Sequence, residues 1–125
     1  MTENEPRHKI LIGFSVPKSS PYAGRIGWLA YQIADGISAL TGGITVHEPE
    51  TCLWHEDGNS DPPYFDVPSE EVGRTITFVT DQDLEKTLDW VKRVFRSEVD
   101  KRDAPVEWVH VEHWPVRVHH FNAQK

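Results

Sequence analysis

Two adjacent glutamates, Glu70 and Glu71, are the acidic pair in this sequence that is best placed for catalysis or ligand binding. They follow a long polar segment and precede a β-rich run at residues 73–80 (GRTITFVT). Paired carboxylates can bind a cation or hold one proton between them, although acidic residues at a strand edge are usually only solvated. The pair is therefore a candidate site for a cationic ligand.

A second candidate set lies in the run VEWVHVEHW at residues 106–114. Because side chains alternate along a strand, Val109 and Val111 share one face of it. The opposite face has two tryptophans, a histidine and a glutamate: Trp108, His110, Glu112 and Trp114. Exposed apolar patches on small domains usually mark contacts, which favours an oligomer interface. The alternative is a ligand pocket at that interface, where indole faces stack on an aromatic or cationic ligand.

Residues 18–25 precede a helical pattern and contain Ser19 and Ser20. The segment is not a P-loop, because it lacks the glycine spacing and the terminal Lys-Ser/Thr pair. Serines at this place are typical of turns and caps. The start of the helix can also present backbone donors to a carboxylate or another small anion, so the two serines are candidate ligand-binding residues.

Metal and nucleophile chemistry are poorly supported by the spacing of the seven histidines and the one cysteine. His110 and His113 point to opposite faces of a regular strand, and the adjacent His119 and His120 cannot both face one site. Cys52 has no second cysteine for a zinc site, and a buried inert thiol is its ordinary role. We therefore expect neither a metal nor a cofactor.

The composition predicts one folded domain over residues 1–125, with a core at about 8–121 and frayed ends. Hydrophobic residues make up 38% and charged residues 26% of the chain. The lone cysteine and the lack of an opening signal segment favour the cytoplasm, and no apolar run is long enough to span a bilayer. With a net charge of −7 and no run of Lys or Arg, we expect no nucleic-acid partner.

The periodicity predicts the order strand, helix, strand, strand, helix, strand. The predicted elements are strand 8–16, a helix from Ile26 to Gly42, strand 44–48 with a continuation at 51–55, strand 73–80, a helix from about 84 to 99, strand 106–114 and a short strand at 116–121. Four apolar residues share one face of the first strand: Ile10, Ile12, Phe14 and Val16. Gly42 and Gly43 end the first helix, and Asp81 or Asp83 can cap the second. This order of elements is that of a βαββαβ, ferredoxin-like α+β sandwich, with two helices on one face of a four-stranded antiparallel sheet. A dimeric α/β barrel has the same order.

Residues 56–70 form a long segment with three prolines and no periodicity, which predicts a loop. Its apolar pair, Tyr64 and Phe65, is suited to docking on the body of the domain. We therefore expect a lid that becomes ordered when a ligand binds.

The segment at residues 42–54 (GGITVHEPETCLW), followed by the loop, the glutamate pair, the run TITFV and a helix, resembles the small phage-encoded S-adenosylmethionine lyases. The resemblance implies a trimeric enzyme of the host cytoplasm that cleaves S-adenosylmethionine and blunts restriction. The glutamate of the family corresponds to Glu70 or Glu71. The lyases also have a tyrosine near the position where this chain has Trp54. An indole cannot replace a phenol as a hydrogen-bond acceptor, so Tyr64 is the candidate substitute for that tyrosine.

The chemistry that the resemblance implies needs neither a metal nor a protein nucleophile. The sulfonium is already an activated leaving group, so the carboxylate of the substrate can displace methylthioadenosine and form homoserine lactone. The protein would hold the reacting ends together. The competing hypothesis is a non-catalytic oligomeric module that sequesters a metabolite or occupies a host protein, which the acidic charge and aromatic face also fit.

Overall fold

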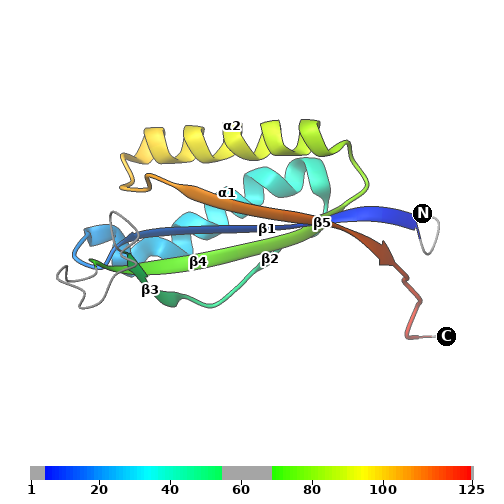
Figure 1. Cartoon of the computed structure of the whole chain (residues 1–125), viewed down its shortest axis with the longest axis horizontal. Coiled ribbons are helices and arrows are strands. Elements are labelled where there is room, and N and C mark those ends of the chain that lie inside the picture. Colours follow the sequence, from blue (N-terminus) through cyan, green and yellow to red (C-terminus); the bar gives the residue numbers. More distant parts are fainter. Residues whose placement is uncertain (1–4, 55–68, 125) are drawn as a thin grey trace, which may run out of the picture.

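The computed structural model describes residues 5–54 and 69–124, which form two helices packed on one antiparallel sheet (Figure 1). The strands are β1 (Glu5–Pro17), β2 (Thr45–Val46), β3 (Glu50–Trp54), β4 (Ser69–Thr80) and β5 (Val109–Val118). A short 3-10 helix, η1 (Pro21–Arg25), leads into α1 (Ile26–Thr41), and α2 (Leu84–Arg102) joins β4 to β5. The strand order β2-β4-β1-β5 is that of a ferredoxin-like fold, as predicted.

The long strands β1 and β4 form the centre of the sheet, where they pair from His8↔Thr80 to Pro17↔Glu71. β5 pairs with the other side of β1. The opposite edge is shared by two short strands, because β2 pairs with Thr77 and Ile76 whereas β3 pairs with the stretch of β4 from Gly73 to Ser69. The sheet thus has four positions, with the predicted second strand divided into β2 and β3.

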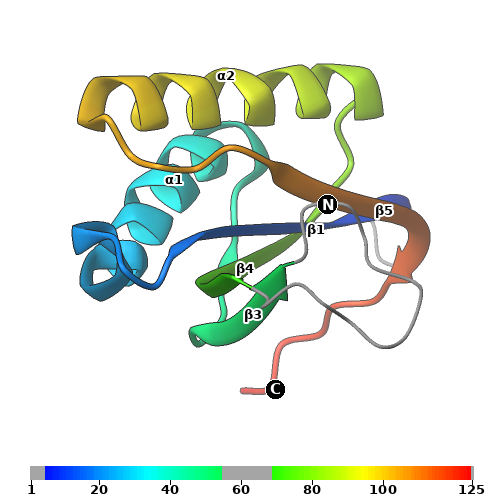
Figure 2. The same cartoon turned by 60° about the vertical axis from the view of Figure 1, so that its left-hand side comes forward.

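The core lies between the sheet and the helices (Figure 2). The predicted inner face of β1 is confirmed, since its four apolar residues are buried: Ile10, Ile12, Phe14 and Val16. On α1, the buried residues that face the sheet include Leu29, Ile33 and Ile37. Phe14 meets Phe95 of α2 edge to face, with ring centroids 5.2 Å apart. Apolar burial between these layers is the main stabilising term of the fold.

The helix ends follow the predicted signals. Gly42 ends α1 with a φ of 86°, a conformation that glycine adopts without steric cost. Asp83 caps α2, because its carboxylate accepts a hydrogen bond of 3.0 Å from the backbone N–H of Lys86. None of the described helices is both long and apolar enough to cross a membrane.

Two predicted strand boundaries were wrong. β4 begins at Ser69, so Glu70 and Glu71 lie inside the strand rather than before it. Pairing with β3 extends β4 in this direction, and such a non-local partner leaves no mark in the local sequence. The predicted strands 106–114 and 116–121 are one strand, β5, which runs through Pro115. Among the described strands β5 pairs only with β1, and an edge strand tolerates the missing N–H of proline.

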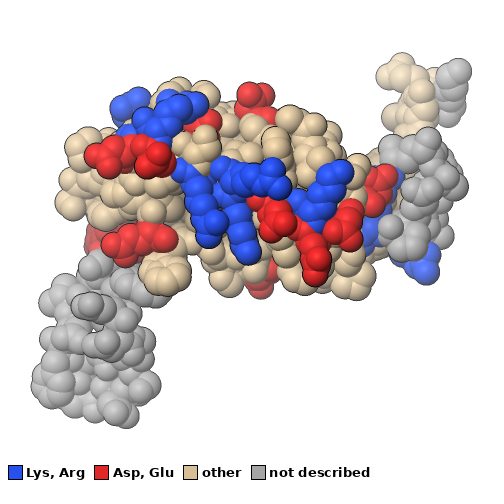
Figure 3. Space-filling model, turned by 90° about the horizontal axis from the view of Figure 1, so that it is seen from above, with Lys and Arg blue, Asp and Glu red and all other residues tan. Residues whose placement is uncertain are grey.

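The outer surface of α2 is charged along its length (Figure 3). Its exposed residues include four cations and three acids: Lys86, Lys92, Arg93, Arg96, Glu85, Asp89 and Asp100. Charges of both signs interspersed on an exposed helix are typical of a solvated surface. The helical side of the domain therefore has the features of a solvent-exposed surface without a specific ligand. The open face of the sheet, opposite the helices, has a different composition.

Candidate functional site

The sheet face opposite the helices is covered by no described helix (Figures 1 and 2). Residues of β1 on this face alternate with the buried ones and include Gly13 and Ser15. Glu71, Gly73 and Thr75 of β4 share the face, because they pair with Pro17, Ser15 and Gly13. The strand register therefore brings polar and very small residues together on the open side of the sheet.

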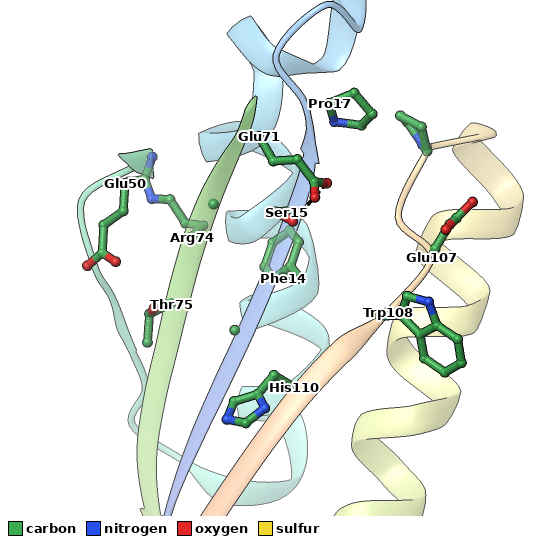
Figure 4. A pocket seen from close by; sticks show the side chains of 13 residues that line it. Phe14, Ser15, Pro17, Glu50, Glu71, Arg74, Thr75, Glu107, Trp108 and His110 are labelled. Atoms are coloured by element: carbon green, nitrogen blue, oxygen red, sulfur yellow. Dashed lines mark hydrogen bonds between the residues drawn. The ribbon is translucent and has the colours of Figure 1, made fainter. Parts of the chain in front are cut away.

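A hollow of about 550 Å³ lies on this face (Figure 4). Gly13 and Gly73, which have no side chains, lie in neighbouring strands at its floor. Trp108 and His110 line it from the side of β5, and Glu50 lines it from β3. The size is in the range of small-molecule sites, so the hollow is the candidate functional site.

Glu71 lies in the hollow and has a defined orientation, because the hydroxyl of Ser15 donates a 3.0 Å hydrogen bond to its Oε1 (Figure 4). Ser15 was not predicted as a site residue. The alternation along β1 places it on the open face, and this signal was available in the sequence. The bond fixes one carboxylate oxygen and leaves the other for a further partner.

Glu70 does not line the hollow. Successive residues of a strand point to opposite sides, so the two adjacent glutamates cannot both face one site. Glu70 forms an exposed 2.9 Å ion pair with Lys18. The hydrogen bond from Lys18 to Glu70, together with the charge of Glu70, raises the pKa of Lys18 above its ordinary value. The structure therefore distinguishes the two glutamates, which the sequence could not do.

His110 and Glu112 lie next to each other on the open face, with 3.4 Å between His110 Nε2 and Glu112 Oε2. Only His110 lines the hollow. Trp108 stands at the rim, just before β5, and is 78% exposed. Trp114 lies further along β5 on the same face and is 37% exposed. The aromatic part of the predicted strand face is thus present, and one of its tryptophans borders the hollow.

The other predicted ligand-binding residues lie elsewhere. Ser20 caps η1, since its hydroxyl accepts a 3.1 Å hydrogen bond from the backbone N–H of Tyr22. Ser19 is exposed, and neither serine lines the hollow. Tyr64 lies outside the residues that the structure describes, as does the predicted lid except for its last two residues. The side chain of Trp54 is not described either.

The charges around the hollow favour a cation. Its described lining has three glutamates, Glu50, Glu71 and Glu107, against one arginine, Arg74. The Nε of Arg74 donates to the backbone carbonyl of His47, which orients the guanidinium without cancelling its charge, and the three carboxylates leave the lining net negative. Within residues 5–54 and 69–124, no group of three His, Cys, Asp or Glu side chains is arranged to hold a metal ion. The arrangement is suited to an organic cation bound by carboxylates and an indole face.

No protein-family model and no curated protein matches the chain. Among solved structures, a hydantoinase/carbamoylase-family amidase from Burkholderia phymatum is similar with a TM-score of 0.45 and 12% identity, over 93% of this chain. The chain spans 31% of the amidase. Ribosomal protein S6 from Thermotoga maritima gives a TM-score of 0.44 and 10% identity, over 89% of this chain and 87% of S6.

A PII-like signalling protein from Thermus thermophilus gives a TM-score of 0.39 and 11% identity, over 94% of each chain. All three TM-scores are below 0.5, and the three proteins have unrelated functions. The similarities therefore give no guide to ligand or activity. Function has to be inferred from the hollow itself.

Proposed function

We propose that this domain binds S-adenosylmethionine in the hollow and cleaves it to methylthioadenosine and homoserine lactone. The observation that supports the proposal best is the placement of Glu71, held by Ser15 in a hollow with three carboxylates and one arginine. A sulfonium is a permanent cation, so this environment favours it over the neutral thioether. Trp108 at the rim adds an indole face suited to cations and aromatic rings.

The reaction balances without a group from the protein. A carboxylate oxygen of the substrate attacks its own γ-carbon, the bond from that carbon to sulfur breaks, and the electron pair stays on sulfur. Sulfur becomes a neutral thioether, and the carboxylate becomes a lactone. No proton moves, so the reaction asks for neither a base nor an activated nucleophile. The task of the protein is to hold the substrate folded, so that its two reacting ends are close.

Glu71 contributes to affinity more than to rate. The positive charge on sulfur disappears as the bond breaks, so a carboxylate beside it stabilises the bound substrate at least as well as the transition state. Replacing the charge should therefore raise KM strongly and change kcat little. Acceleration comes from the enclosure and orientation of the substrate.

The test is to incubate purified protein with S-adenosylmethionine and to separate methylthioadenosine and homoserine lactone by chromatography. We expect wild type to form both products and Glu71→Gln to need more substrate for the same rate. Glu70→Gln is the matched control, because it removes the same charge one residue away and outside the hollow. Wild-type protein that forms neither product contradicts the lyase activity, and equal KM values for the two variants contradict the role of Glu71.

A binding module is the second candidate function, and the exposed aromatic residues of the open face favour it. Trp108 borders the hollow and is exposed, and Trp114 pairs in register with Lys9, whose ammonium lies 5.9 Å from its ring centroid.

We propose that further copies of the chain contact the two tryptophans, in a homo-oligomer that the resemblance predicts to be a trimer. Light scattering that gives the mass of a single chain at micromolar concentration contradicts the oligomer.

A further inference from the structure

We infer that a flat ring of the ligand lies on the backbone of Gly13, which we call the ring seat. The ligand of the hollow is then a cation joined to a planar heteroaromatic group. This inference rests on the proposed function, which it deepens by dividing the ligand between two parts of the hollow. The ring lies over the floor at Gly13, and the cationic centre lies toward Glu71. Gly13 then determines specificity, although it contributes no side chain.

The fold gives no reason for a glycine at this position. Gly13 lies in the middle of the central strand β1, where it pairs with Thr75 on one side and His110 on the other. Glycine weakens a strand, because it loses more backbone freedom on folding than any other residue and has no side chain to pack. Among the described glycines only Gly42 has a positive φ, so the backbone of Gly13 does not require it.

Steric crowding does not require it either. A Cβ built on Gly13 meets no atom of the described protein within 4 Å. Gly36 is the opposite case, because a Cβ there would lie 2.9 Å from Cγ1 of Val94. The space above Gly13 is therefore part of the hollow rather than part of the core. A glycine that is unnecessary for the fold and lies under an open hollow is explained by close approach of a ligand to the backbone.

The surroundings of Gly13 fit a ring in particular. Gly73 also lines the hollow, one residue pair along the sheet where it lies opposite Ser15, so the floor around Gly13 has few bulky side chains and a planar group can lie flat on the backbone of Gly13. The imidazole of His110 extends from β5 toward β1 beside this patch, and Thr75 borders it from β4 (Figure 4). Both have polar atoms suited to hydrogen bonds with the edge of a heteroaromatic ring.

The experiment compares two sulfonium ligands, one with and one without the adenosyl group that carries the ring. S-methylmethionine has the sulfonium and the amino-acid part of S-adenosylmethionine, with a methyl group in place of the adenosyl group. Their affinities are measured by calorimetry for wild type, Gly13→Ala and Gly24→Ala. Gly24 is the matched control, because a Cβ there also meets nothing within 4 Å and the residue does not line the hollow. A thermal melt of each variant reports its folding.

We expect Gly13→Ala to weaken S-adenosylmethionine about tenfold or more and to leave S-methylmethionine within about twofold. Its melting temperature should equal or exceed that of wild type, and Gly24→Ala should change neither affinity. If wild type binds S-adenosylmethionine and Gly13→Ala binds it equally well, or loses both ligands alike, the ring seat is wrong while the proposed function stands. If wild type binds neither ligand, the proposed function and the ring seat both fail.

Discussion

The two faces of the central strand β1 differ in what they contribute. The face toward the helices has a continuous row of buried apolar residues, Ile10, Ile12, Phe14 and Val16. The face away from the helices has a cation, one apolar residue and two small residues in the same stretch: Lys9, Leu11, Gly13 and Ser15. One strand thus supplies both a row of core residues and part of the floor of the candidate site, with the two sets interleaved residue by residue.

The core and the candidate site are therefore separated by side-chain alternation rather than by position along the chain. The core face must fill space completely, because gaps in a packed interior cost free energy. The open face has no such requirement within the described structure, so it can keep a glycine and a hydrogen-bonded serine. Substitutions at neighbouring residues of β1 should consequently have very different effects.

The largest expected effect comes from neighbours on opposite faces. Ile12→Ala should lower the free energy of unfolding by about 2–5 kcal/mol, because it leaves a cavity in the core. Leu11→Ala removes a partly exposed side chain next to it, and we expect a loss below about 1 kcal/mol. Urea unfolding of both variants measures the difference. Equal losses would show that the open face is packed as tightly as the core.

A smaller effect distinguishes two glycines. Gly36→Ala should destabilise the domain by about 1 kcal/mol, because the clash of the new Cβ with Val94 between α1 and α2 outweighs the gain in helix propensity. Gly13→Ala should leave the free energy of unfolding unchanged or raise it, since its Cβ enters open space. Urea unfolding tests both. A destabilised Gly13→Ala would mean that the fold itself needs this glycine.

The smallest effect is expected at Glu70. The raised pKa of Lys18 means that the ion pair stabilises the fold below the ordinary lysine pKa of 10.5 and stops doing so as the pH rises through the folded value. Both side chains are largely exposed, so the contribution is small. Glu70→Gln should therefore melt slightly below wild type by the same amount at pH 7 and pH 9, as thermal scans would show. A difference that grows between these pH values would contradict this assignment.

The sequence predicted the fold well where local patterns were decisive. The alternation of β1 and the helical periodicity from Ile26 appear in the structure, and of the two candidate caps, Asp81 and Asp83, it is Asp83 that caps α2. The start of β4 was misplaced, because its pairing with β3 connects segments on either side of a long excursion. That error hid the fact that Glu70 and Glu71 point to opposite sides.

The candidate site was predicted in part, through Glu71 and His110. Gly13 and Ser15 were not predicted as site residues. The same alternation that indicates the core face of β1 places both of them on its opposite, open face. A glycine and a serine in a strand have no local pattern that marks them as ligand-binding, whereas the apolar residues of β1 mark the core face. The hollow is made by register between three strands, from Ser15↔Gly73 to Gly13↔His110, and register is a tertiary property that a single sequence does not state.

The proposed function requires a sulfonium to bind beside Glu71 on the open face of the sheet. The most direct test measures the affinities of S-adenosylmethionine and S-adenosylhomocysteine, which differ by one methyl group and one positive charge, for wild type and Glu71→Gln. The glutamine can still accept the hydrogen bond from Ser15, so shape is kept and charge is removed. We predict about tenfold preference of wild type for the sulfonium and less than about threefold preference in the variant. Equal preference in the two proteins, or no binding by wild type, would contradict the sulfonium site.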